Sequence, residues 1–282
     1  MKLPSGLVGV GIGPRVEEID ARWLMAYAAA LGETDEAYLD TRRPGGILAH
    51  PLFPVCYEWP LAVEMRAALP EEVALRSVHA SHDLRLHRLP RPGDRLSVRA
   101  TVTRVEPRRS GAAVLSRYEA LDAGGEPVST TDYGSIYLGV ACEPEGVAPP
   151  ASGSAGPEGA GAQWSADVAV APTLAHVYTE CARIWNPIHT DRAVAARAGL
   201  PGIILHGTAT LALAVSRVLA QEGRAADAVR RVSGRFAAMV SMPSTLTVQG
   251  RALPREHAQA FQALVGGRPA VRDGMIWFGG HS

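Results

Sequence analysis

The segment Leu200-Pro-Gly-Ile-Ile-Leu-His-Gly207 decides how the chain is organised, because a close copy of it, Pro44-Gly-Gly-Ile-Leu-Ala-His-Pro51, occurs in the first half. Each copy follows a short helical pattern and a polar loop, and each precedes an apolar segment long enough for a buried helix. A chain of 282 residues has room for two domains of ordinary size. The repeated order therefore predicts two similar units in tandem.

The first unit is predicted to place its helices before its strands. Asp20 is a suitable N-cap for a helix over residues 21–31. Residues 53–69 are apolar enough for a long buried helix, which Pro60 should kink or end early. Strict alternation of apolar and polar side chains over residues 95–103 indicates a half-buried strand. The strands expected in this unit are residues 95–103, 113–121 and 128–138.

The second unit repeats this plan, with a short helix near residues 173–182 and an amphipathic helix near residues 208–221. Its expected strands are residues 232–240, 244–251, 258–265 and 270–278. A helix wrapped by an antiparallel sheet, formed twice, is an α+β architecture. Two fused units can pair their sheets and so cover the edge that one unit alone would expose.

Residues 144–162 separate the two units in the sequence. The segment consists almost entirely of Pro, Gly, Ala, Ser and Glu and lacks apolar periodicity, so it cannot bury enough surface to offset its ordering entropy. We expect domains at residues 1–143 and 163–282. Residues 1–14 are predicted to form a first strand or arm, not a signal peptide, because Pro and Gly interrupt them and no cleavage pattern follows.

Bulk composition excludes several classes of function. The formal net charge is zero, which argues against nucleic acid or a charged membrane surface as partner. No apolar run reaches the roughly 18 residues needed to span a bilayer. Three scattered cysteines imply neither a disulfide framework nor a metal site, so a cytoplasmic protein is expected. No cofactor is predicted, and four histidines of the first half, His50, His79, His82 and His87, lack the spacing of a metal site.

The segment Asn186-Pro-Ile-His189-Thr-Asp191, followed by Ile204-Leu-His206-Gly207, resembles the hydratase 2 signature of MaoC-like proteins. This resemblance implies two tandem hot-dog domains, each an antiparallel sheet wrapped around a long helix. It also implies reversible addition of water across the α,β bond of a CoA or carrier-protein thioester, usually with R stereochemistry at carbon 3. The first unit, whose motif is degenerate, would then supply the acyl pocket.

The resemblance assigns roles to single residues. The motif histidine, His189, would exchange protons with substrate and water, which suits an imidazole near neutral pH. The backbone N–H of Gly207 would hold the thioester oxygen, because the first N–H groups of a helix are unpaired within it. Asn186 would belong to the catalytic loop, and Ile184 and His206 would contact the substrate.

The sequence departs from the family pattern at the motif aspartate, where Ile184 stands, and at the preceding glycine, where Arg183 stands. Isoleucine cannot move a proton. In the first unit Glu33 occupies the aspartate position, but Tyr38 replaces the histidine. Since the family draws both groups from one unit, we do not expect Glu33 to reach His189. Two other carboxylates stand near the motif and are candidates to substitute, Glu180 and Asp191.

Three functions follow from these features. The His189 and Gly207 signature favours a hydro-lyase, a 3-hydroxyacyl-thioester dehydratase or enoyl hydratase. Ile184 favours altered chemistry on the same scaffold, as in an isomerase, cyclase or thioesterase of specialised metabolism. Neither unit has both a carboxylate at the aspartate position and a histidine at the histidine position of the motif. This allows a third function, a non-catalytic acyl-binding or dehydratase-partner subunit. The predicted partner is an acyl-CoA or acyl-carrier-protein thioester, and the sequence leaves homodimerisation open.

Overall fold

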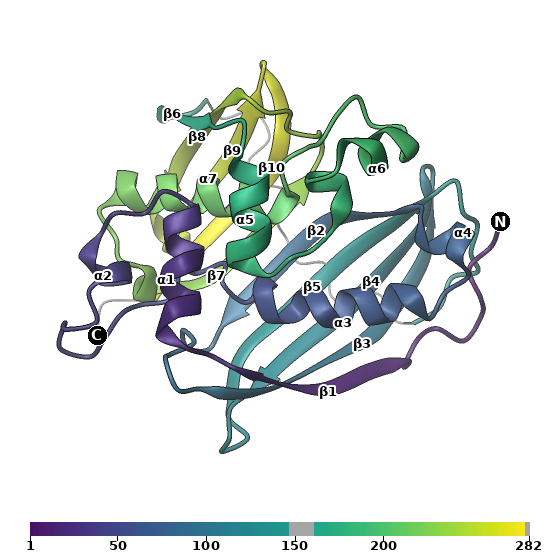
Figure 1. Ribbon diagram of the computed structural model, residues 1–282, viewed down its shortest axis with the longest axis horizontal. Helices are drawn as coiled ribbons and strands as arrows, with labels where there is room; N and C mark the ends of the chain where they lie inside the picture. The colour runs from purple at the N-terminus through teal and green to yellow at the C-terminus, as the bar shows by residue number, and fades with distance from the viewer. Residues whose placement is uncertain (147–160, 280–282) are drawn as a thin grey trace.

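A computed structural model describes residues 1–146 and 161–279, and its strands form a single ten-stranded sheet (Figure 1). The strand order is β1-β3-β4-β5-β2-β7-β10-β9-β8-β6, so the first half of the chain supplies one side and the second half the other. The two sides join where β2 pairs antiparallel with β7. The strands are β1 (Gly11–Glu18), β2 (Ser77–Leu86), β3 (Arg95–Arg108), β4 (Gly111–Leu121), β5 (Pro127–Leu138), β6 (Trp164–Val170), β7 (Val229–Phe236), β8 (Ser244–Leu253), β9 (Ala258–Val265) and β10 (Arg268–Phe278).

Each side of the sheet wraps around one long helix. In the first half α3 packs on β1 and β3, and in the second half α7 packs on β8, β9 and β10. This is the predicted double hot-dog arrangement, and α1 and α5 pack against each other where the halves meet (Figure 1). The helices are α1 (Ala21–Ala30), α2 (Glu36–Leu39), α3 (Val55–Ala67), α4 (Glu71–Ala74), α5 (Leu174–Ala182), α6 (Arg192–Arg197) and α7 (Gly207–Glu222).

Apolar periodicity explains why these strands form. The alternating residues of β3 that were expected on one face, Leu96, Val98, Ala100 and Val102, are all buried. Every second residue of β4 is buried in the same way. The two-residue period of a strand puts these side chains on one face of the sheet. That face covers α3 and the core.

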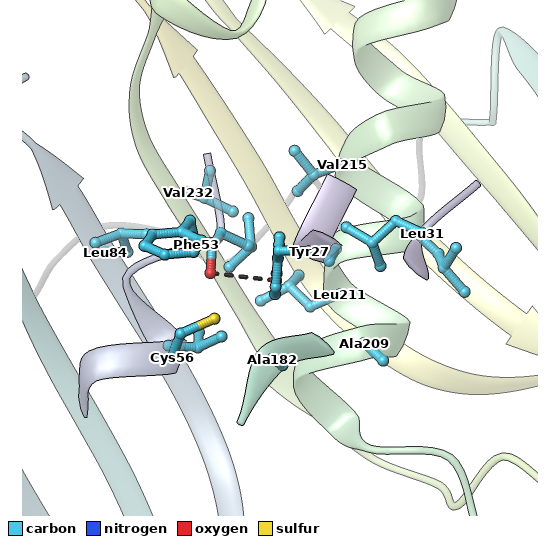
Figure 2. Packing of buried hydrophobic residues seen from close by; sticks show 14 of the residues in the cluster. Tyr27, Leu31, Phe53, Cys56, Leu84, Ala182, Ala209, Leu211, Val215 and Val232 are labelled. Carbon is cyan, nitrogen blue, oxygen red and sulfur yellow. Dashed lines mark hydrogen bonds between the residues drawn. The ribbon is translucent and has the colours of Figure 1, made fainter. Parts of the chain in front are cut away.

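One hydrophobic cluster extends through both halves. Figure 2 shows Phe53 and Leu84 of the first half packed close to Leu211 and Val232 of the second. Burying one such side chain contributes about 1.5–3 kcal/mol. The two halves therefore stabilise each other.

Polar contacts also join the halves. Arg231 on β7 donates two hydrogen bonds, of 2.7 and 2.5 Å, to the carboxylate of Asp83 on β2. The hydroxyls of Tyr27 on α1 and Tyr178 on α5 lie 3.3 Å apart in the buried contact between these helices. Tyr27 and Tyr178 occupy corresponding places in the two halves, so the contact follows the repeat.

The structure corrects several expectations about single elements. Pro60 was expected to kink its helix or end it early; it does not end the helix, because α3 continues past it to Ala67. Packing of its buried face outweighs the lost backbone hydrogen bond. The sequence did not predict β6 as a strand, and β7 lies a few residues earlier than expected. Most of the predicted linker, residues 147–160, lies outside the described residues, and the domain boundaries stay a prediction.

Candidate active site

A cavity of about 430 Å³ lies where the two halves meet. Its walls come from α3, β2, β5, the loop after α5, the start of α7 and the segment that follows β7. The cavity brings together all five residues that the sequence singled out, which are Ile184, Asn186, His189, His206 and Gly207.

The backbone after α5 explains how Ile184 and Arg183 are placed. Arg183 adopts a left-handed conformation (φ 57°), and the N–H of Ile184 donates to the carbonyl five residues earlier. Gly32 and Glu33 repeat this geometry after α1, with φ 78° at Gly32. A left-handed residue is usually glycine. The backbone therefore supports the alignment of Arg183 with the motif glycine and of Ile184 with the motif aspartate.

His189 presents one ring nitrogen to the cavity. Its Nδ1 lies 2.8 Å from the carbonyl oxygen of Ile204. Since a carbonyl oxygen only accepts, Nδ1 carries the proton and Nε2 carries the lone pair. Burial lowers the pKa of His189 to about 4. The ring is therefore neutral at pH 7 and suited to act as a base through Nε2.

His206 stacks on His189, with ring centroids 3.7 Å apart and planes inclined by 27°. Its Nε2 lies 3.1 Å from Oγ1 of Thr179, and its buried Nδ1 has no hydrogen-bond partner among the described residues. Burial first, and then the neighbouring His189, hold the pKa of His206 well below its usual value. His206 is thus a second neutral imidazole, and its stacking on one face of the His189 ring holds that ring in place.

Gly207 is the first residue of α7, and His206 before it has an extended backbone (φ −59°, ψ 137°). The first bond back to the N-cap is the N–H of Thr210 donating to the His206 carbonyl at 3.0 Å, so the N–H of Gly207 has no acceptor within the helix. A Cβ at this position would lie 3.1 Å from the ring of Phe236. Gly207 thus supplies an unpaired N–H at the cavity wall and lets Phe236 approach closely.

None of the carboxylates considered from the sequence lines this cavity. Asp191 caps α6 by accepting from the backbone N–H groups of its first turn at 2.7 and 3.1 Å. Glu180 is exposed and accepts from the indole of Trp185 at 3.4 Å. Glu33 lies near Ser216 and Tyr38, and burial raises its pKa. The expectation that Glu33 does not reach the His189 cavity agrees with this placement.

The sequence did not identify Glu58, a carboxylate that does line the cavity. Glu58 lies on α3 with a side chain 2% exposed, and Oγ1 of Thr131 donates to its Oε1 at 2.5 Å. Its buried Oε2 has no partner within the part of the chain that the structure describes. Burial raises the pKa of Glu58 to about 7. A single charged residue in the apolar stretch Val55–Val63 was the available signal.

A second cavity of about 310 Å³ continues along α3 toward the N-terminal arm. It shares two lining residues, Arg66 and Tyr133, with the His189 cavity. Ala62 lines it from the middle of the helix. Helix α3 therefore borders both cavities, and Arg66 and Tyr133 lie where the two adjoin.

These features define a double hot-dog protein whose candidate active site is the His189 cavity. Residues 156–259 match the model described as "MaoC like domain", and residues 6–131 match the "FAS1-like, dehydratase domain region". The first of these matches confirms that residues 156–259 are similar to the MaoC-like domain family, as the motif indicated. No curated protein shows significant sequence similarity to the chain.

Solved structures share this fold. A MaoC-like dehydratase from Phytophthora capsici is 20% identical with a TM-score of 0.83, over 98% of this chain and 97% of that one. The peroxisomal multifunctional enzyme type 2 of Drosophila melanogaster is 22% identical with a TM-score of 0.78, over 94% of this chain and 48% of that one. A conserved Mycobacterium tuberculosis protein described as a double hot-dog is 16% identical with a TM-score of 0.62, over 95% of this chain and 94% of that one.

Among residues 1–146 and 161–279, no three His, Cys, Asp or Glu side chains converge in a way that could hold a metal ion. Within the same ranges, no helix has the length and apolar character needed to cross a membrane.

Proposed function

We propose that the protein adds water to, or removes it from, the α,β bond of an acyl thioester carried by CoA or a carrier protein. The observation that carries this proposal is the neutral His189, whose Nε2 is not engaged by the Ile204 carbonyl, in a cavity also lined by Gly207, whose N–H has no acceptor within α7. A base beside an oxyanion donor is the arrangement needed to remove a proton α to a thioester. The MaoC-like match of residues 156–259 supports the same reaction class.

In the dehydration direction, Nε2 of His189 takes the α-proton, and the electrons of that C–H bond move toward the thioester carbonyl. The Gly207 N–H donates a hydrogen bond to the resulting enolate oxygen. The enolate then expels the hydroxyl at carbon 3, the carbon–carbon double bond forms, and the imidazolium returns its proton to the departing hydroxyl as water. The ring ends neutral, so one base completes the cycle without the motif aspartate.

A second candidate function is isomerisation of the double bond, and the observation that favours it is Ile184. The buried isoleucine lines the cavity where the family carries an aspartate able to orient water. A single base beside an oxyanion donor can move a proton between two carbons without water. Hydrolysis of the thioester, in contrast, needs an activated water at the carbonyl.

Incubation of the purified protein with crotonyl-CoA and longer trans-2-enoyl-CoAs tests the proposal. We expect the enoyl absorbance to fall as 3-hydroxyacyl-CoA forms. Release of free CoA would instead identify a thioesterase, and a shifted double bond an isomerase. Binding without any turnover would indicate a non-catalytic acyl-binding subunit and would contradict the proposal. The cytoplasmic location and a homodimer stay predictions.

The pH dependence of kcat/KM is expected to differ from that of an ordinary histidine base. Because burial lowers the pKa of His189 to about 4, the base form persists as the pH falls and is lost only near pH 4. Activity should therefore stay nearly constant between about pH 5.5 and pH 7. An acid limb with its midpoint near pH 6.5 would contradict this assignment. The other titratable groups of the cavity are Glu58, Arg66, His79, His82, Tyr133 and His206.

Glu58 is the group of this set whose ionisation falls nearest to neutral pH, because burial raises its pKa to about 7. The pH profile is therefore also measured on the Glu58→Gln variant. A change near pH 7 that disappears in this variant belongs to Glu58. The acid limb of His189 should be the same in both proteins. Circular dichroism at each pH confirms that the protein is folded.

Enlarging Ala62 should shorten the accepted acyl chain, because Ala62 lines the second cavity along α3. We expect Ala62→Trp to lower kcat/KM for long enoyl-CoAs by about tenfold or more, with crotonyl-CoA little affected; a pocket contact of one or two methylenes already changes rates by roughly 10- to 200-fold. The matched control is Val63→Trp, which introduces the same indole side chain at an exposed position of the same helix. An unchanged chain-length preference in a folded Ala62→Trp protein would refute this placement of the acyl chain.

A further inference from the structure

The His189 cavity has buried polar atoms that a hydrocarbon chain would leave without partners. Glu58 and His82 both line it, and their side chains are 2% and 1% exposed. Oε2 of Glu58 and both ring nitrogens of His82 have no hydrogen-bond partner among the described residues. Buried polar groups are paired in the great majority of cases, and an unpaired one costs folding free energy. Side-chain packing alone therefore does not explain why these polar atoms are buried without partners.

Glu58 and His82 gather on one part of the cavity wall. Thr131, which donates to Glu58, pairs with Leu84 in the register of β5 and β2, while Tyr133 pairs with His82. Thr131 and His82 are thus diagonal neighbours on one face of the sheet, roughly 7–8 Å apart or closer. Two residues with unpaired polar atoms, Glu58 on α3 and His82 on β2, therefore lie close together in the lining of the cavity.

This region adjoins the second cavity along α3. Tyr133, the register partner of His82, lines both the His189 cavity and the second cavity along α3. An acyl chain that starts at His189 and runs along α3 would pass Glu58 and His82 before reaching the second cavity. The two polar groups would then face the middle of the chain rather than the thioester.

We infer that the acyl chain carries a hydroxyl or keto oxygen along its length, to which Glu58 and His82 hydrogen-bond. This inference rests on the proposed function, which makes the ligand an acyl thioester. A carboxyl that is protonated donates to a keto or hydroxyl oxygen, and burial raises the pKa of Glu58 enough for this form to be abundant at pH 7. The neutral imidazole of His82, whose pKa burial lowers to about 4, supplies one donor and one acceptor.

Paired thioesters of equal length test the inference. One is trans-2-decenoyl-CoA, and the others are the same chain with a single hydroxyl or keto group on one of the carbons beyond the double bond. We expect at least one oxygenated chain to exceed the plain chain by about tenfold or more in kcat/KM, the effect of roughly one hydrogen bond in a buried site. A plain chain hydrated as well as every oxygenated chain would overturn the inference.

Substitutions at Glu58 assign the preference to this residue. Glu58→Leu should lower the ratio of kcat/KM for the preferred oxygenated chain to kcat/KM for the plain chain by about tenfold, both measured on the same variant. Glu58→Gln retains a donor and should keep most of the preference. The control is Glu64→Leu, which removes an exposed carboxylate from the same helix and should retain the wild-type preference. A preference that survives Glu58→Leu would overturn the role of Glu58.

Binding of saturated analogues separates this inference from the proposed function. Decanoyl-CoA and its hydroxyl- or keto-bearing counterparts cannot undergo hydration, so calorimetry measures recognition alone. Tighter binding of an oxygenated chain, lost in Glu58→Leu, supports the inference even if no enoyl thioester is turned over. Equal affinities for plain and oxygenated chains contradict it even if hydration is efficient.

Discussion

Replacement of His189 by alanine should abolish most of the enoyl hydration, with a loss in kcat/KM of roughly 100- to 10,000-fold. The loss should lie toward the upper end of this range, because His189 would both remove the α-proton and return it to the hydroxyl. Glu33, Glu180 and Asp191 do not line the cavity, and Glu58, which does, is assigned above to the acyl chain and not to the α-carbon. The measurement is the rate of absorbance loss for crotonyl-CoA and for the preferred longer thioester.

The control for this substitution is His87→Ala, which removes an exposed histidine hydrogen-bonded to Thr130 and distant from the cavity wall. His87→Ala should keep the wild-type rate. Binding of a saturated acyl-CoA to His189→Ala shows that the cavity is intact. Hydration that survives His189→Ala undiminished would contradict the assignment of the site.

Removal of the Gly207 N–H should have the second largest effect. Gly207→Pro deletes this donor at the first position of α7, where proline is tolerated in helices. The backbone of His206 (φ −59°, ψ 137°) already has the extended conformation that precedes proline. Loss of one oxyanion donor reduces the rate by about 100- to 1,000-fold. We expect a reduction of this size relative to the matched variant Gly207→Ala.

Gly207→Ala is the necessary reference because both substitutions introduce a Cβ, which lies 3.1 Å from the ring of Phe236 when built on the wild-type backbone. The alanine variant keeps the N–H and therefore measures the effect of the Cβ alone. The difference between the two variants then reports the donor. Equal kcat/KM values for folded Gly207→Pro and Gly207→Ala would exclude this N–H as the oxyanion donor.

Much of the fold could be predicted because it follows from local patterns. The strict alternation in residues 95–103 fixed a strand with its buried face, and the structure buries all four apolar residues expected there. Helix α3 behaves differently, because its continuation past Pro60 depends on packing between distant segments. The same applies to β2, whose pairing with both β5 and β7 is a long-range property of the sheet. Local propensity does not contain this information.

The site shows the same division. The motif placed His189, His206 and Gly207 close together along the chain, and the structure gathers them in one cavity. Glu58 comes from the other half and meets them only through the joining of the two sheets. Its position in an apolar helical stretch was visible in the sequence, but neither its burial nor its unpaired oxygen was. A motif in one unit therefore cannot identify a site residue, such as Glu58, that the other unit contributes.

Product analysis in water labelled with oxygen-18 tests the central claim most directly. The protein is incubated with a trans-2-enoyl-CoA in labelled water, and the products are identified by mass spectrometry. The account predicts a 3-hydroxyacyl-CoA with one oxygen from the solvent at carbon 3 and an intact thioester, formed by wild type but not by His189→Ala. Labelled free acid, an unlabelled isomer of the substrate, or labelled 3-hydroxyacyl-CoA formed equally by His189→Ala would contradict it.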